Sequence, residues 1–134
     1  MGYYRRDQPP SSAKVKIITA KNATLQEAYQ FDPPDVDDPT PPVWSLLPNF
    51  RLDVKAYFEQ AVALLSLTSA AGQIVVDDPV QRLIHFNVPE TSIVPPLVPG
   101  VYVYDLINFD NSVPPIRIPL MHGDFIVTDG VTGG

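Results

Sequence analysis

The sequence contains no cysteine, so disulfide bonds, thiolate metal sites and thiol catalysis play no part in its structure or chemistry. Basic residues are also scarce, because nine Lys and Arg stand against 15 Asp and Glu and the net charge is −6. Proteins that bind nucleic acids neutralise phosphate groups with clusters of Lys and Arg. The composition therefore argues against a nucleic-acid partner.

Long hydrophobic runs are missing as well, although 45% of the 134 residues are hydrophobic. No stretch approaches the roughly 18 apolar residues from which a membrane-spanning helix is recognised. The first twelve residues, MGYYRRDQPPSS, lack the apolar segment of a secretory signal. We therefore expect no membrane partner, and we expect the chain to be made or assembled in a cytosol.

Acidic and basic residues together are fewer than usual. Charged residues make up 18% of the chain, below the roughly 25% that is usual for soluble domains. This shortfall predicts that partners cover part of the surface. The length is that of one domain, and the hydrophobic content is sufficient for one core.

Proline is the residue in excess, with 16 in the chain, about 12% against roughly 5% on average. Because proline lacks the amide donor and clashes with the preceding helical turn, long helices are disfavoured. Five of the prolines and four aspartates lie in FDPPDVDDPTPPVW, residues 31–44, which predicts an extended loop. This segment lacks the glycine and the ligand rhythm of a calcium loop, so we expect no metal and no other cofactor.

Short segments with period-2 alternation of apolar residues recur along the rest of the chain. The clearest is NFRLDVKAYFEQ, residues 49–60, which predicts a strand, with a helix over residues 54–66 as the competing interpretation. One face of this strand would carry Phe50, Leu52, Val54, Ala56 and Phe58. Further strands are predicted within residues 13–20, 23–31 (where a short helix is the alternative), 61–68, 70–79, 81–89, 100–109 and 116–129, the last interrupted near Pro119 or at His122-Gly123.

Six to eight short strands, with turn signals about every 10 residues, are typical of antiparallel sandwiches and barrels. The sequence therefore predicts an all-β protein, an immunoglobulin-like antiparallel β-sandwich over residues 13–134 preceded by an extended arm at residues 1–12. Residues 90–100, ETSIVPPLVPG, hold three prolines and are predicted to form a crossing loop.

The segment GVYVYDLINF after this loop places two tyrosines on one side of a strand, because residues two apart face the same way. Gly100, Tyr102 and Tyr104 have the spacing of the tyrosine corner of immunoglobulin-like sandwiches, whose hydroxyl bonds to nearby upstream backbone. Tyr102 would then hold residues 90–99 in place, and Tyr104 would stand where antibody domains have a cysteine. A ligand platform and ordinary core packing are the alternative interpretations.

Residues with catalytic potential are few and scattered. The histidines, His85 and His122, lie on different predicted strands, and no serine stands in a Gly-x-Ser-x-Gly elbow. Asp77 and Asp78 precede a proline at the end of a strand and are predicted to be turn residues. The sequence therefore predicts no enzyme activity.

The C-terminal part of the chain carries GVYVYDL, then a short turn, then IRIPLMHGDFIV and a final GVT. The residues of this pattern are Gly100, Tyr102, Tyr104, Asp105, Leu106, Leu120, Gly123, Val127, Val131 and Thr132. The pattern resembles a group of small structural proteins of tailed bacteriophages, and the resemblance covers about residues 50–134. These proteins are similar to the N-terminal domains of baseplate and fibre-attachment proteins. The first 49 residues have no counterpart in that group.

The resemblance implies a virion component, a small adaptor at the tail, baseplate or neck that attaches neighbouring tail or fibre proteins in several symmetric copies. A second interpretation is a capsid decoration protein. A third is a carbohydrate-binding module that stacks sugars on Trp44, Tyr57 and Tyr102 or Tyr104. Since Tyr and Arg are enriched at interface hot spots, the candidate interface residues are Tyr3, Tyr4, Arg5 and Arg6 in the arm, together with Trp44.

Overall fold

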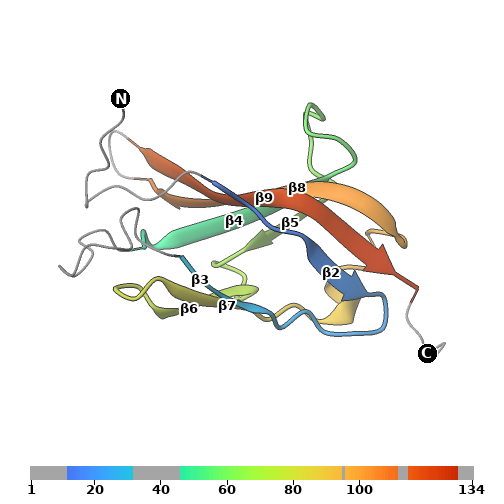
Figure 1. The fold of residues 1–134 in the computed structure, drawn as a ribbon, viewed down its shortest axis with the longest axis horizontal. Coiled ribbons are helices and arrows are strands. Elements are labelled where there is room, and N and C mark those ends of the chain that lie inside the picture. Colours follow the sequence, from blue (N-terminus) through green and yellow to red (C-terminus); the bar gives the residue numbers. More distant parts are fainter. Residues whose placement is uncertain (1–11, 32–45, 95, 112–114, 130–134) are drawn as a thin grey trace.

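The computed structural model describes residues 12–31, 46–94, 96–111 and 115–129, which form an all-β structure of two sheets (Figure 1). These residues contain nine strands and one short 3₁₀ helix, η1. Their bounds are β1 Ala13–Lys14, β2 Ile17–Ala20, β3 Ala28–Gln30, β4 Asn49–Lys55, β5 Leu65–Thr68, β6 Ile74–Asp78, β7 Leu83–Phe86, η1 Glu90–Ser92, β8 Gly100–Asp110 and β9 Ile116–Thr128. The all-β prediction is confirmed.

The larger sheet has the strand order β1-β9-β8-β4-β5, and β2 also pairs with β9. Its centre is a long antiparallel hairpin of β8 and β9, with 11 and 13 residues. The register shifts between Leu106, opposite Met121, and Ile107, opposite Pro119. The extra residue, Leu120, makes a bulge next to a proline that cannot donate a ladder hydrogen bond. The predicted interruption near Pro119 is therefore a shift in the pairing register between β8 and β9, and strand β9 itself continues.

One edge of the larger sheet corrects the prediction of a wholly antiparallel fold. Both β1 and β2 run parallel to β9, with Ala13 opposite Met121 and Ile17 opposite Phe125. Alternation correctly predicts that Ile17 and Thr19 are buried. The predicted direction of pairing was wrong because apolar residues alternate in the same way in parallel and antiparallel strands. The partner strand, β9, is the last strand of the chain, so no local pattern indicates it.

The smaller sheet has the order β3-β7-β6, all antiparallel. Before β3, Leu25 makes an isolated bridge to Val88, so the segment is extended and the alternative of a short helix at 23–31 is wrong. In the turn between β6 and β7, Asp78 accepts hydrogen bonds from the backbone N–H groups of Val80 and Gln81, at 3.0 and 3.1 Å. Asp78, the last residue of β6, thus stabilises the turn, whereas Asp77 lies within the strand, so the prediction that both are turn residues is wrong for Asp77.

The core lies between the two sheets, which form two layers in Figure 1. The largest fully buried side chains come from both sheets and from two residues of the crossing loop, Ile93 and Leu97: Tyr104, Phe50, Phe86, Phe125, Ile17, Leu52, Leu67, Ile74, Ile84, Ile93, Leu97 and Leu106. Because the loop contributes to the core, the chain that crosses from the smaller sheet to β8 is held by apolar contacts as well as by hydrogen bonds.

The segment after β4 differs from its prediction. The strand ends at Lys55, so the alternation through Ala56 and Phe58 does not continue in the structure, and Phe58 is 53% exposed. The backbone N–H of Ala56 binds the side chain of Gln60 instead, at 2.7 Å, and residues 56–64 form a projecting loop (Figure 1). The loop leads to β5, so the helix over 54–66 is wrong and only the second half of 61–68 is a strand.

Candidate functional site

The hydroxyl of Tyr102 closes a short loop in front of β8. It donates a hydrogen bond to the carbonyl oxygen of Val98 at 2.6 Å, and the N–H of Val98 donates back to it at 3.3 Å. This is the contact that a tyrosine corner makes with upstream backbone. A Cβ at Gly100 would lie 3.7 Å from the Tyr102 ring, an ordinary van der Waals distance, so space does not demand glycine there.

Tyr104 faces the core and reaches a different part of the chain. Its hydroxyl donates to the carbonyl oxygen of Val15 at 2.6 Å, and its ring meets Phe125 edge-on at 6.3 Å. Burial, followed by the negative charge of Glu27, raises the pKa of the Tyr104 hydroxyl well above its ordinary range, so it stays protonated and remains a donor. Both hydroxyls are thus bound to the protein's own backbone, one at Val98 and the other at Val15.

The Val15 carbonyl occupies space that Gly123 leaves open. Gly123 lies opposite Tyr104 in the β8–β9 ladder, and a Cβ built on it would be 2.5 Å from the oxygen of Val15. Its φ of +149° is one that other residues rarely adopt. Val15 also donates its N–H to the carbonyl of His122 at 2.8 Å. We call Val15, Tyr104 and Gly123 the N-terminal anchor, because they fix the break between β1 and β2 against β9.

The two tyrosines should differ in their contribution to stability. Tyr104→Phe is expected to lower the free energy of unfolding by about 2–3 kcal/mol, because it leaves the Val15 carbonyl without its donor in a part-buried site. Tyr102→Phe is expected to lower it by about 1 kcal/mol, since water can reach the exposed Val98 carbonyl. Urea denaturation of both variants measures the difference, and equal values for the two would contradict the anchor.

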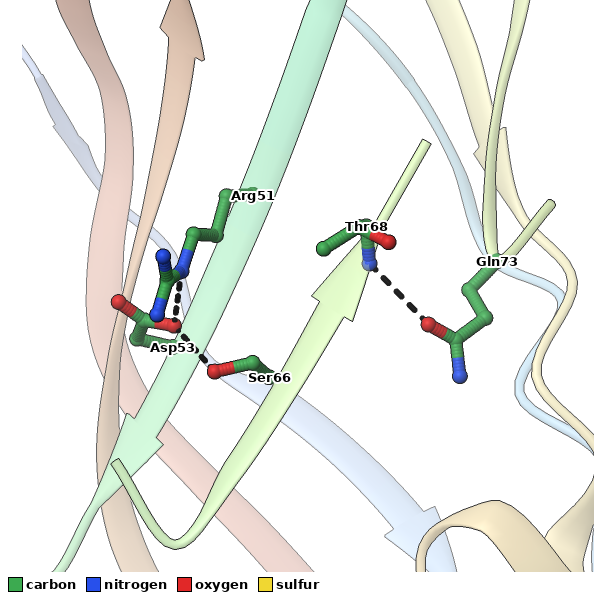
Figure 2. Close-up of polar contacts among 5 residues, drawn as sticks. All are labelled: Arg51, Asp53, Ser66, Thr68 and Gln73. Atoms are coloured by element: carbon green, nitrogen blue, oxygen red, sulfur yellow. Dashed lines mark hydrogen bonds and ion pairs between the residues drawn. The ribbon is translucent and has the colours of Figure 1, made fainter. Parts of the chain in front are cut away.

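The outer face of the larger sheet, which points away from the smaller sheet, carries a polar row. Ser66, Asp53, Asp105 and His122 stand side by side on β5, β4, β8 and β9. One oxygen of Asp53 accepts from the Ser66 hydroxyl at 2.6 Å and from Arg51 Nε at 2.9 Å (Figure 2). The polar row is therefore held by hydrogen bonds at its β4–β5 end.

Asp105 lies directly opposite Asp53, and like charges in this position repel. Burial first, and then Asp53, raises the pKa of the Asp105 carboxyl, against a smaller lowering by Lys55 and Arg51. A carboxyl whose pKa is raised on folding binds its proton more tightly in the folded state. Its contribution to stability therefore falls as the pH rises from the unfolded-state pKa through the raised one.

A second, apolar row crosses the same face nearer the end of β9. Ile18 on β2 lies opposite Ile126 on β9, which lies opposite Val101 on β8. Ile18 is 52% exposed and Val101 66% exposed. We call Ile18, Ile126 and Val101 the outer apolar row. Contiguous exposed apolar side chains of this kind mark interaction surfaces, whereas single ones are common on any protein.

The remaining polar candidates do not form a common site in the described part of the chain. His85 contacts Asp77 at 2.9 Å on the smaller sheet, while His122 contacts the Ser12 hydroxyl at 2.8 Å on the larger one. Among residues 12–31, 46–94, 96–111 and 115–129, no three potential ligands gather to hold a metal ion. In these same residues, no helix has the length and apolar character needed to cross a membrane.

The predicted interface residues Tyr3, Tyr4, Arg5, Arg6 and Trp44 lie outside the described residues, as does nearly all of the proline-rich loop at 31–44. Neither the N-terminal anchor nor the outer apolar row was recognised from the sequence. A signal for the anchor was present, because a glycine inside a strand often marks the close approach of another backbone segment.

Comparison with known families finds no family that matches this chain, and no curated protein matches it either. The resemblance to phage structural proteins therefore depends on the motif residues between Gly100 and Thr132, and it stays a hypothesis.

Proposed function

We propose that this protein is a structural component of a tailed-phage virion, an adaptor at the tail, baseplate or neck that binds its neighbours through the outer face of the larger sheet. The observation that carries the proposal is the outer apolar row, in which the exposed Ile18 and Val101 lie on either side of the half-buried Ile126 on three adjacent strands. Burying this row against a neighbour would remove apolar area from water, at roughly 25 cal/mol per Å².

Other features support assembly through this face. The loop at residues 56–64 carries further exposed apolar side chains, namely Tyr57, Phe58, Val62 and Leu64. Phe58 lines a small depression together with Val103, which lies on the same face of β8 as Val101. Charged side chains, Asp53, Lys55 and Asp105, also line this depression, so the face combines apolar and charged contacts. Repeated copies of such a surface would combine weak contacts into avidity.

We further propose that the two sheets form an immunoglobulin-like sandwich. The support for it is the bond of Tyr102 to Val98, together with the crossing loop that joins the smaller sheet to β8. A carbohydrate-binding module finds less support, because the hydroxyls of Tyr102 and Tyr104 are engaged with the protein's own backbone and Tyr104 is buried. Among the described residues that were predicted to stack sugars, this leaves Tyr57 as the best candidate.

The substitution Val101→Asp tests the proposal. Aspartate in the outer apolar row would place a charge in the interface, so we expect incorporation into phage particles to fall at least tenfold while the isolated protein stays folded. Val80→Asp is the matched control, because Val80 is 61% exposed and lies in a turn of the smaller sheet. Complementation of a deletion phage, followed by gradient purification and immunoblotting, measures incorporation. Normal incorporation of Val101→Asp would exclude this face as the interface.

A further inference from the structure

The outer face of the larger sheet also has a depression near the start of β9, at the other end of the sheet from the outer apolar row. Its volume is about 400 Å³. It is lined by Arg51, Asp53, Ile107, Phe109, Asn111 and Arg117. We call it the arginine cleft, because cationic side chains stand on both of its sides.

The register of three strands produces this arrangement. Arg51 lies opposite Ile107 across β4 and β8, and Arg117 lies opposite Phe109 across β8 and β9. Ile107 and Phe109 are two apart on β8, so they face the same way and form an apolar floor. Arg51 therefore stands beside Ile107 and Arg117 beside Phe109, on the two strands that neighbour β8.

Both guanidinium groups keep hydrogen-bond donors for a ligand. Arg51 uses its Nε for Asp53 (Figure 2), and its side chain is 54% exposed. Arg117 lies over the ring of Phe109, with its central carbon 6.0 Å from the ring centroid. Within the described parts of the chain, no hydrogen bond or ion pair reaches the Arg117 guanidinium. Arg51 and Arg117 are both exposed, and no hydrogen bond within the described residues uses Arg51 Nη1 or Nη2 or the donors of Arg117.

The cleft is locally positive on a protein whose net charge is −6. Its lining has two arginines and one carboxylate, and one oxygen of that carboxylate, from Asp53, already accepts from Arg51 and Ser66. Repulsion by distant acidic groups is screened beyond about 8 Å at physiological ionic strength. An anion in the cleft therefore meets two arginines and one carboxylate, Asp53, and the planar donor pairs of the arginines match a carboxylate.

We propose that the arginine cleft binds an acidic side chain on an apolar peptide segment of a neighbouring protein. The inference depends on the proposed function in so far as that neighbour belongs to an assembly. A peptide fits better than an acidic sugar, because Arg117 covers the Phe109 ring and leaves Ile107 as an aliphatic floor. The cleft also shares its sheet face with the outer apolar row, so one partner can occupy both.

Nuclear magnetic resonance titration of the ¹⁵N-labelled full chain tests the proposal, with the capped peptide acetyl-Leu-Glu-Val-Glu-Leu-amide as the probe. We expect saturable shifts of the Ile107, Phe109 and Arg117 amides, with a Kd of about 1 mM or tighter. The matching peptide with Gln in place of Glu should bind about tenfold more weakly. Equal binding of the two peptides would overturn the proposal, because the cleft would then recognise only apolar residues.

Charge-removing variants locate the site. Arg51→Gln and Arg117→Gln should each weaken peptide binding about tenfold, whereas Lys16→Gln, which removes an equal charge outside the cleft lining, should leave it unchanged. An equal loss in all three variants would mean that net charge alone attracts the peptide, and the proposal would fail. Tighter binding of an oligogalacturonate than of the Glu peptide would also overturn it.

The outcome is separable from that of the proposed function. If the peptide does not bind but Val101→Asp still blocks incorporation into particles, the cleft inference is wrong and the adaptor function stands. If the peptide binds with the expected variant pattern but Val101→Asp is incorporated normally, the cleft stands and assembly through the outer apolar row is wrong.

Discussion

Replacing Gly123 by alanine is expected to lower the free energy of unfolding by about 3–5 kcal/mol, a large part of the roughly 5–15 kcal/mol that holds a domain folded. Two effects combine. The new Cβ would lie 2.5 Å from the carbonyl oxygen of Val15, so the backbone of the β1–β2 edge would have to move. The φ of +149° would also strain alanine, whatever space it had. Urea denaturation followed by circular dichroism measures the loss.

Gly72→Ala is the matched control for this substitution. Gly72 also has a positive φ, +78°, but a Cβ there would meet nothing within 4 Å. We therefore expect only the backbone strain, about 1–2 kcal/mol. If the two variants lose the same stability, strain accounts for both and the close approach of Val15 to Gly123 contributes nothing.

Asn108→Leu is expected to lower the free energy of unfolding by about 3 kcal/mol, because unpaired buried backbone groups cost about 1–3 kcal/mol each. Asn108 is fully buried on β8. Its Oδ1 accepts from the N–H of Leu47 at 2.8 Å, and its Nδ2 donates to the carbonyls of Leu47 and Asn49 at 2.9 and 2.8 Å. Leucine fills a similar volume but offers none of these bonds, so the start of β4 would lose its polar support.

The control is the same substitution at an exposed asparagine. Asn87→Leu, just after β7, should change the free energy of unfolding by no more than about 0.5 kcal/mol. Thermal and urea denaturation of both variants provides the comparison. A loss at Asn108 no larger than the loss at Asn87 would show that the three hydrogen bonds do not stabilise the fold.

The strands were the part of the fold most accessible from the sequence, because alternation of apolar residues is a local pattern. Within residues 49–60, it correctly identified the inward positions of β4 as far as Val54. It failed beyond Lys55, where Ala56 and Phe58 continue the alternation but have no neighbouring strand to pair with. Pairing depends on distant partners, which also explains the unexpected parallel edge at β9.

The difference between local and long-range contacts also separates the contacts that the sequence predicted from those that it did not. The bond of Tyr102 to Val98 spans four positions, so residue spacing was sufficient to suggest it. Tyr104 reaches Val15 across 89 positions, and Asn108 reaches Leu47 across 61. The arginine cleft needs the register of three strands before Arg51 and Arg117 can be placed around one floor. No local pattern contains this information.

The central proposal is that the chain is a structural component of a phage particle. Quantitative mass spectrometry of gradient-purified infectious particles tests it most directly. The account predicts that the chain is present at a constant copy number that is a multiple of the symmetry order of the tail, and a copy number in the hundreds would instead assign it to capsid decoration. Particles that are fully infectious and contain none of the chain would contradict the account.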